Sequence, residues 1–225
     1  MRFAAVIFDR DHTLLAFDST RVEAIQARID SIAPELPPSA VLHLWNGWPG
    51  PWPQQPADET PFWRSFWSAL GERHRLSPGQ IATLEAEIGP VYHTIFTAYP
   101  DSLPCLHALR AADLRLAVLT NFELPSVDRT LAYAGIDPKL FEIALSSVTL
   151  GVRKPNPQAF YAIATALHLP PNACLFVDDL RENVAAARSI GMEALQIDRT
   201  RIDDDLANGV IATLAGLPRA VLPPI

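Results

Sequence analysis

Apolar and polar positions at the start of the chain follow two successive patterns. Residues 3–8, FAAVIF, are a short apolar run that ends in polar residues, which is typical of a buried strand. From Phe17 to Ile32 the apolar positions recur at helical spacing, and Thr20 with Glu23 forms a capping-box pattern near the start. Prolines between positions 34 and 38 then end the predicted helix, because proline lacks a backbone donor and blocks the preceding turn.

A passage rich in tryptophan, proline and glycine follows at residues 45–61, WNGWPGPWPQQPADETP. Its prolines predict a loop, held in place by packing of its own tryptophans. Thr60 and Pro61 fit the N-cap and first position of the next helix, whose aromatic residues gather on one broad face. Ser77, with proline next and Gln80 three positions on, predicts a further helix that ends near residue 89.

From about residue 99 the pattern changes to strands that alternate with helices. The pattern predicts strands over residues 114–119, 143–145, 173–177 and 193–197, and helices over residues 103–110, 126–134, 156–168 and 182–190. Such alternation is typical of a parallel sheet covered on both faces. We therefore expect a doubly wound, Rossmann-like α/β core made of residues 1–15 and 99–225, with residues 16–98 inserted as an all-helical module.

Composition and charge narrow the classes of partner. The 225-residue chain has a formal net charge of −7, which argues against a surface for nucleic acid or for an anionic membrane. Apolar runs are too short for a signal peptide or a membrane span. Cys105 and Cys174 lie in apolar segments without paired spacing, which favours a reducing compartment. We expect a cytoplasmic protein, and the sequence does not indicate its oligomeric state.

Polar side chains gather where the predicted strands end. In an open parallel sheet, ligands bind beyond the carboxyl ends of the strands, so these side chains are expected to lie close together. Asp9 and Asp11 also share a face of the chain, because side chains alternate along a strand. The set consists of Asp9, Asp11, Thr13, Thr120, Asn121, Asp178 and Asp179, with Lys154 on a loop just before a helix.

Several carboxylates in one place repel one another unless a cation is bound, and hard oxygen ligands suit Mg²⁺. Only two of the 18 cationic side chains are lysines, Lys139 and Lys154, and a compact ammonium suits an anionic phosphoryl group. An aspartate in such a site can attack phosphorus, while a second acid moves the proton of the leaving group or of water. The residues thus point to phosphoryl transfer.

Four groups of residues resemble, in order and position, the four motifs of the haloacid dehalogenase superfamily of hydrolases. The inserted helical module resembles the helical cap of that family, and the similarity extends over the whole core. The four groups are Asp9 to Leu14 (DRDHTL), Thr120 with Asn121, Lys154 with Pro155, and Asp178 and Asp179 with Asn183.

The resemblance implies that Asp9 is the nucleophile and a Mg²⁺ ligand. Asp11 would be the general acid and base, and its backbone carbonyl would also bind the metal. Asp178 would complete the metal shell. For Asp179 two interpretations stay open, because the family often has an acidic residue there near the metal, whereas Glu182 three positions on suggests an ordinary helix N-cap.

The resemblance also implies that Thr120 and the amide of Asn121 bind phosphate oxygens, and that Lys154 bridges the phosphate and the nucleophile. Two positions depart from the family pattern. His12 stands where the family usually has glycine, so its imidazole either crowds the site or adds a donor to the substrate. Arg10 stands where relatives commonly have an apolar residue.

These observations favour a Mg²⁺-dependent phosphatase that acts on a small phosphorylated metabolite. A 2-haloacid dehalogenase is the first alternative, although it would leave Asp11 and Asp178 without a purpose because halide departs without an acid. A catalytically weak binding protein of the same fold is a second alternative, suggested by His12 and Arg10. A phosphomutase is a third, and its distinguishing groups would lie in the inserted module.

Overall fold

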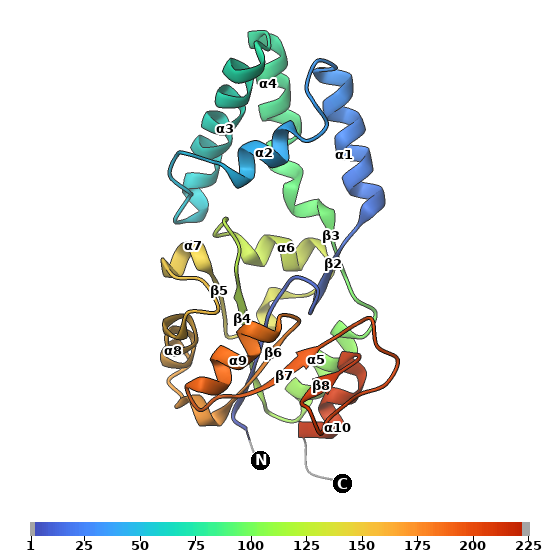
Figure 1. Ribbon diagram of the computed structural model, residues 1–225, viewed down its shortest axis with the longest axis vertical. Coiled ribbons are helices and arrows are strands. Elements are labelled where there is room, and N and C mark those ends of the chain that lie inside the picture. Colours follow the sequence, from blue (N-terminus) through green and yellow to red (C-terminus); the bar gives the residue numbers. More distant parts are fainter. Residues whose placement is uncertain (1–2, 222–225) are drawn as a thin grey trace.

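The computed structural model describes residues 3–221, which contain a six-stranded sheet in which every neighbouring pair of strands is parallel (Figure 1). The strand order is β5-β4-β1-β6-β7-β8, so the chain leaves the central β1 toward one edge and later returns to build the other. This confirms the predicted doubly wound α/β fold. The strands are β1 (Ala5–Phe8), β4 (Arg115–Thr120), β5 (Ile143–Ser146), β6 (Cys174–Asp178), β7 (Glu193–Ile197) and β8 (Val210–Ile211).

Helices cover both faces of this sheet, because successive residues of a strand face opposite sides and apolar residues occupy both sides. In β1, Ala5 and Ile7 belong to one buried cluster, and Val6 and Phe8 belong to the other. The first face packs against α7 (Ser147–Leu150), α8 (Pro157–Ala166) and α9 (Arg181–Ser189). The second face packs against α5 (Ser102–Ala111), α6 (Val127–Tyr133) and α10 (Leu217–Val221). Short 3₁₀ turns complete the core at η3 (Pro138–Leu140), η4 (Pro171–Ala173) and η5 (Leu214–Gly216).

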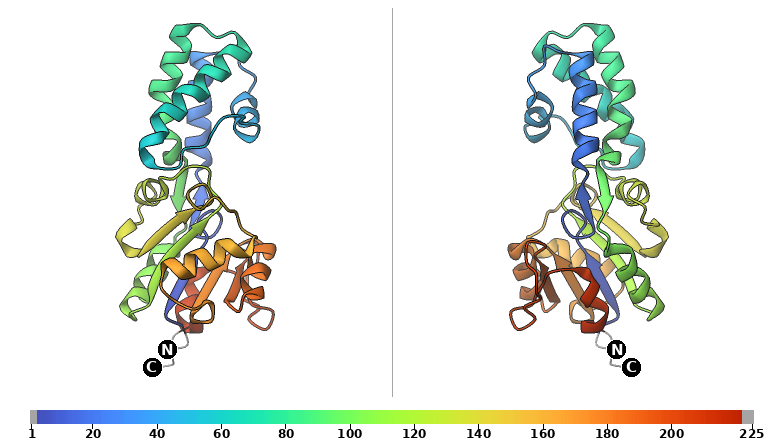
Figure 2. Two further views of the ribbon diagram at one scale, coloured as in Figure 1. Left: turned by 90° about the vertical axis from the view of Figure 1, so that its left-hand side faces the viewer. Right: turned by 90° about the vertical axis from the view of Figure 1, so that its right-hand side faces the viewer.

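A group of helices stands apart from the sheet at one end of the molecule, as the two side views of Figure 2 show. This group, called the helical module below, comprises α1 (Ser19–Ile32), α2 (Ala40–Asn46), η1 (Pro56–Asp58), α3 (Glu59–His74), α4 (Pro78–Glu87) and η2 (Gly89–Ile95). Two linkers connect it to the core, and they pair as antiparallel strands, β2 (Leu15–Phe17) and β3 (Phe96–Ala98). The sequence analysis did not predict this pairing, which joins residues about 80 positions apart.

Aromatic side chains fill the interior of the helical module. Trp45 and Trp52 lie 4.8 Å apart between ring centroids, and both rings also contact Phe62 of α3. Trp67 is almost fully buried. The tryptophans of the 45–61 passage therefore pack as predicted, but the passage is not loop throughout, because α2 extends to Asn46 and η1 forms one turn at its far end.

Two predicted helix starts are wrong by two residues. The side chain of Asp18, not that of Thr20, caps α1 by accepting a hydrogen bond of 3.2 Å from the backbone N–H of Arg21. The linker strand ends just before Asp18, so the chain turns into the helix earlier than the capping-box pattern suggested. Likewise, α3 begins before Thr60, with Asp58 at its cap position.

Other predicted helix ends are confirmed. Ser77 and Gln80 form the expected capping box at the start of α4. Gly135 and Gly191, which follow α6 and α9, have positive φ angles of 87° and 84°, the conformation that glycine adopts without steric cost after a helix.

Both cysteines are buried and unpaired. Burial raises the pKa of Cys105 to about 12 and that of Cys174 to about 11, so both thiols stay protonated at neutral pH. Among residues 3–221, none of the helices has the length and apolar character that a bilayer crossing requires.

Candidate active site

Lys154 occupies the centre of the site at the carboxyl edge of the sheet. Its ammonium donates three hydrogen bonds, to Asp9 Oδ1 at 2.6 Å, to Asp178 Oδ2 at 2.7 Å and to the Leu119 carbonyl at 2.7 Å. The Lys154 side chain is only 1% exposed. Lys154 therefore joins the ends of β1, β4 and β6, three strands that the sequence analysis expected to meet here.

The side chain of Asn121 fixes the position of Lys154. Its Oδ1 accepts a hydrogen bond of 2.9 Å from the Lys154 backbone N–H, and its Nδ2 donates one of 2.8 Å to the Lys154 carbonyl. The loop that carries the lysine is thus tied to the end of β4 at two points. The side-chain amide of Asn121 is therefore engaged by Lys154, and the contact of its main-chain N–H with phosphate stays a prediction.

Asp178 is fully buried and is held by more than the lysine. Its Oδ1 accepts hydrogen bonds from the Leu180 backbone N–H at 2.8 Å and from Asn183 Nδ2 at 3.0 Å. The cap position of α9 is Leu180, without a side-chain cap bond, so the N-cap interpretation of Asp179 is wrong. Asn183, which the sequence analysis placed in the fourth motif, orients the carboxylate of Asp178.

Carboxylate oxygens of Asp9, Asp178 and Asp179 lie within 4.8 Å of one another. Burial raises the pKa of Asp9 to about 8, against the opposing effect of the Lys154 ammonium, and Asp178 and Asp11 raise it further. Burial also raises the pKa of Asp179, with a further contribution from Asp178. Lys154 takes only one oxygen of Asp9, so the other is available to a second cation. Three hard oxygen donors with excess negative charge fit Mg²⁺.

The carboxylate of Asp11 lies outside that three-residue cluster. Both of its oxygens accept hydrogen bonds from Arg10, from Nε at 3.0 Å and from Nη2 at 2.9 Å. Arg10 is completely buried, its guanidinium lies 3.8 Å from the ring centroid of Phe122, and it also donates to Thr130 Oγ1 at 3.1 Å. From the sequence, Arg10 was identified only as a departure from the family pattern, and its contact with Asp11 was missed.

His12 adopts the left-handed conformation, with a φ angle of 57°. Glycine adopts this conformation without steric cost, which explains why glycine suits the position, and histidine is among the residues that tolerate it. The imidazole is exposed and lies 5.8 Å from the ring of Phe17, between centroids. The ring therefore lies beside β2, the first linker. The predicted contact of His12 with the substrate stays a prediction.

Two threonine hydroxyls at the site are buried without a partner. Thr120 is 1% exposed at the end of β4, and Thr13 is fully buried after β1. Among the described residues, the Oγ1 atom of each finds no hydrogen-bond partner. A buried polar atom without a partner is costly, so these atoms suit a ligand that completes their hydrogen bonding.

Arg199 supports the loop after β1 and was not identified from the sequence. Its guanidinium donates to the carbonyls of His12 at 3.2 Å and Thr13 at 2.6 Å, and it forms an ion pair with Asp101 at 3.1 Å. The same guanidinium stacks 3.6 Å from the ring centroid of Tyr99. This network fixes the backbone that follows Asp11.

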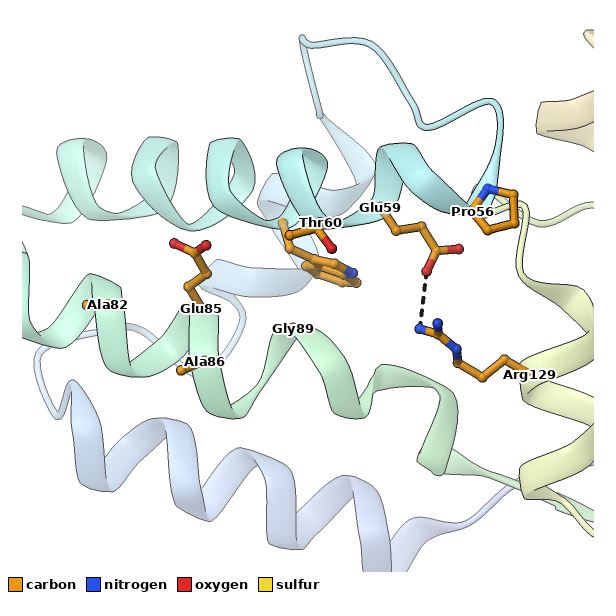
Figure 3. A pocket seen from close by; sticks show the side chains of 9 residues that line it. Pro56, Glu59, Thr60, Ala82, Glu85, Ala86, Gly89 and Arg129 are labelled. Atoms are coloured by element: carbon orange, nitrogen blue, oxygen red, sulfur yellow. Dashed lines mark ion pairs between the residues drawn. The ribbon is translucent and has the colours of Figure 1, made fainter.

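The buried carboxylate of Glu59 is one of the contacts between the helical module and the core. Glu59 of α3 accepts a hydrogen bond of 3.1 Å from the backbone N–H of Ser126, at the start of α6, and pairs with Arg129 of α6 at 3.6 Å. Figure 3 shows this ion pair across a cavity of about 350 Å³ that lies mainly among the module's helices. A larger cavity, of about 710 Å³, separates the module from the core, and Asp11 and Asn121 lie in its wall.

Together these features define an α/β enzyme whose acidic, lysine-bridged site lies at the carboxyl edge of the sheet, below an inserted helical module. The chain belongs to the haloacid dehalogenase-like hydrolases, because the profile of that family matches residues 3–191.

Relatives and solved structures agree with this assignment. The chain is 34% identical to Phosphatase MT3486 of Mycobacterium tuberculosis, over 96% of each chain. It is 27% identical to a phosphoglycolate phosphatase of Pasteurella multocida, over 84% of this chain and 83% of the relative. A 2-haloacid dehalogenase from Pseudomonas syringae pv. Tomato DC3000 has a similar fold, with a TM-score of 0.70, 22% identity, and coverage of 97% and 98% of the two chains.

Proposed function

We propose that this hydrolase is a Mg²⁺-dependent phosphatase that cleaves a small phosphorylated metabolite through an aspartyl-phosphate on Asp9. The observation that carries the proposal is the lysine bridge, in which Lys154 binds Asp9 and Asp178 while the Thr120 hydroxyl beside them has no partner among the described residues. An ammonium and a buried hydroxyl donor next to a carboxylate suit the oxygens of a phosphoryl group. The relatives that carry phosphatase names support the same conclusion.

In this proposal Asp9, Asp178 and Asp179 hold Mg²⁺, together with the backbone carbonyl of Asp11. When bound, the ion would neutralise the carboxylates and the phosphoryl oxygens, which otherwise repel each other. The raised pKa of Asp9 supports a need for positive charge beyond that of Lys154.

The reaction proceeds in two displacements. A carboxylate oxygen of Asp9 forms a bond to phosphorus as the ester P–O bond breaks, and Asp11 donates a proton to the departing oxygen. Asp11 then takes a proton from water, whose oxygen bonds to phosphorus as the bond to Asp9 breaks. The products are the alcohol and inorganic phosphate. The hydroxyl of Thr120 and the main-chain amide of Asn121 bind the phosphoryl oxygens throughout, and Lys154 binds them when one of its three present hydrogen bonds opens.

The contact between Arg10 and Asp11 places a condition on this sequence. Both oxygens of Asp11 accept a hydrogen bond from Arg10, so the proton is exchanged either at the second lone pair of an oxygen or after one of these bonds opens. The bidentate contact also limits the carboxylate to one orientation. Arg10 is therefore a positioning residue for the acid and base.

We propose in addition that residues 16–98 form a cap over the site and that the protein acts in the cytoplasm on a soluble metabolite. Leu15 and Ala98, at the proposed boundaries, face each other in the paired linkers β2 and β3. A cap joined through such a pair can enclose a substrate against the core.

A 2-haloacid dehalogenase ranks lower. Halide leaves without an acid, and that reaction gives no purpose to the proton-transfer role of Asp11 or to the acidic cluster around Asp178. The similar fold of solved dehalogenases is compatible with either activity.

The test measures phosphate release from a panel of phosphomonoesters and chloride release from 2-chloropropionate, each with Mg²⁺ and with EDTA. We expect Mg²⁺-dependent phosphate release that falls at least about a thousandfold in Asp9→Asn, because loss of a covalent nucleophile removes most of the rate enhancement. Asp198→Asn is the matched control, because Asp198 follows β7 and, among the described residues, its side chain accepts hydrogen bonds only from Thr200. Phosphate release that persists in Asp9→Asn, or chloride release with EDTA, would contradict the proposal.

A further inference from the structure

The larger cavity has a charged end and an apolar remainder. Its charged lining residues are Arg10, Asp11 and Glu123, which all belong to the core. Each is already paired, since Arg10 binds Asp11 and Glu123 forms an ion pair of 2.6 Å with Arg153. Among the described residues, the cavity therefore offers no free cation to a second anionic group of the substrate.

The helical module supplies most of the remaining wall, and its contribution carries no charge. Aliphatic and aromatic side chains dominate this part of the wall. Its polar groups are the side chains of Gln26 and Ser39 and the indole and phenol groups of the aromatic residues. The apolar lining residues of the module include Val22, Ile25, Ile29, Val41, Leu42 and Trp67.

Several of these apolar side chains are exposed. Leu42 is 60% exposed and Val22 is 40% exposed, and Phe17, in the adjoining linker, also lines the cavity and is exposed. Large apolar side chains that face solvent together mark a binding surface, because covering them releases water from apolar area. The cavity is also continuous with the candidate site, since Asp11 and Asn121 lie in the same wall.

We propose that the alcohol portion of the substrate is an uncharged apolar group, alkyl or aryl, that fills this cavity while the phosphoryl group lies at Asp9. This inference rests on the proposed phosphatase activity and adds the class of substrate. A carboxylate on the leaving group, as in phosphoglycolate, would lose its hydration in this cavity without gaining a cationic partner. Burial of an unpaired charge is costly. A cavity of about 710 Å³ is within the usual range for organic ligands.

The experiment uses n-alkyl phosphates from ethyl to octyl, because their leaving groups differ little in chemistry and mainly in apolar area. We expect kcat/KM to rise about three- to fourfold for each added methylene until the cavity is filled. Phosphoglycolate and glycerol 3-phosphate are expected to react no faster than ethyl phosphate. A flat alkyl series, or a preference for phosphoglycolate, overturns the inference and leaves the phosphatase activity standing.

A substitution that adds a positive charge to the cavity tests where the leaving group binds. Leu42→Arg places a cation on the module's side of the cavity, so we expect at least a tenfold loss with octyl phosphate and a gain with phosphoglycolate. Leu206→Arg is the matched control, since Leu206 is 56% exposed in the segment between β7 and β8, outside this cavity. Equal effects of the two substitutions overturn the assignment of the cavity.

A binding measurement distinguishes a failure of this inference from a failure of the proposed phosphatase activity. Methyl-, butyl- and octylphosphonate, which cannot be hydrolysed, are titrated by calorimetry into the Mg²⁺-loaded wild-type protein. Affinity that rises with chain length supports the inference even where no ester turns over, a result that by itself contradicts the phosphatase. Affinity that is independent of chain length overturns the inference.

Discussion

The two sides of the larger cavity, the core and the helical module, differ in the kind of interaction that their side chains make. The core side leads to Asp9, Asp178 and Lys154, which are buried and do not line the cavity, and each hydrogen bond that holds them has a fixed donor and acceptor. On the side of the helical module, Val22 and Leu42 are partly solvated and carry no charge. Charge that develops in a reaction requires fixed dipoles, whereas apolar contact tolerates changes of shape. Substitutions should therefore cost most at the edge of the sheet and least in the module.

Lys154→Met is expected to have the largest effect. It leaves two buried carboxylates without their shared cation, so we expect a loss of about 3–5 kcal/mol in the free energy of unfolding and a loss of phosphate release. Urea denaturation measures the first quantity and a phosphate assay the second. The control is Lys139→Met, because Lys139 is the other lysine of the chain and is exposed. A loss below about 1 kcal/mol would mean that the lysine bridge is not needed for stability.

Arg10→Lys should have the next largest effect. Lysine cannot make the bidentate contact with Asp11, so Asp11, the proposed acid and base, loses its fixed orientation. We expect kcat to fall by about tenfold to a hundredfold with little change in KM, since general acid and base catalysis contributes at least this much. Steady-state kinetics measures both parameters. An increase in kcat would instead show that Arg10 restrains Asp11.

A change of pH should alter the affinity for Mg²⁺, which is a smaller effect than those of the two substitutions above. The pKa of Asp9 is raised to about 8, so below that pH the metal-free protein binds a proton that Mg²⁺ must displace. Affinity for Mg²⁺ should therefore improve as the pH rises from 6 to 8, by up to about tenfold per unit.

Isothermal calorimetry in two buffers of different ionisation enthalpy measures this affinity together with the number of protons released. Asp9→Asn should abolish the pH dependence. An affinity of the wild-type protein that does not change between pH 6 and 8 would contradict the assignment of Asp9 as a metal ligand with a raised pKa.

Glu59→Gln is expected to have the smallest effect, because it weakens one contact between the module and the core. The substitution removes the charge that pairs with Arg129 and faces the start of α6, so we expect a loss of about 1 kcal/mol in unfolding free energy. Glu85→Gln serves as the control, since Glu85 lines the same cavity of Figure 3 but pairs with the exposed Arg64. Exposed pairs contribute little, so Glu85→Gln should cost less than about 0.5 kcal/mol. Thermal denaturation compares the two, and equal losses would contradict a stabilising contact between Glu59 and α6.

The core was predictable because its information is local. Apolar runs such as residues 3–8 and 173–177 identify buried strands, and the parallel topology then brings the polar residues that follow them to one edge of the sheet. This reasoning is sufficient to bring Asp9, Lys154 and Asp178 together, as the structure does.

The supporting contacts were not predictable because their partners are far away in the chain. Arg10 binds Thr130 across 120 positions, and Glu59 reaches Ser126 across 67 positions. The antiparallel pairing of the two linkers, β2 and β3, likewise joins residues that are far apart in the chain. Arginine and glutamate in these segments look like ordinary charged residues until the fold supplies their partners. The departure of Arg10 from the family pattern was the available signal.

The clamp formed by Arg199 has a consequence for the order of events during synthesis. Arg199 holds the carbonyls of His12 and Thr13, and it lies 187 positions after His12. At about 5–20 residues per second, a ribosome adds it roughly 10–40 seconds after the loop that it fixes. We expect a nascent chain to carry Asp9 early but to gain the finished loop after β1 only once Arg199 has been added and has left the ribosome.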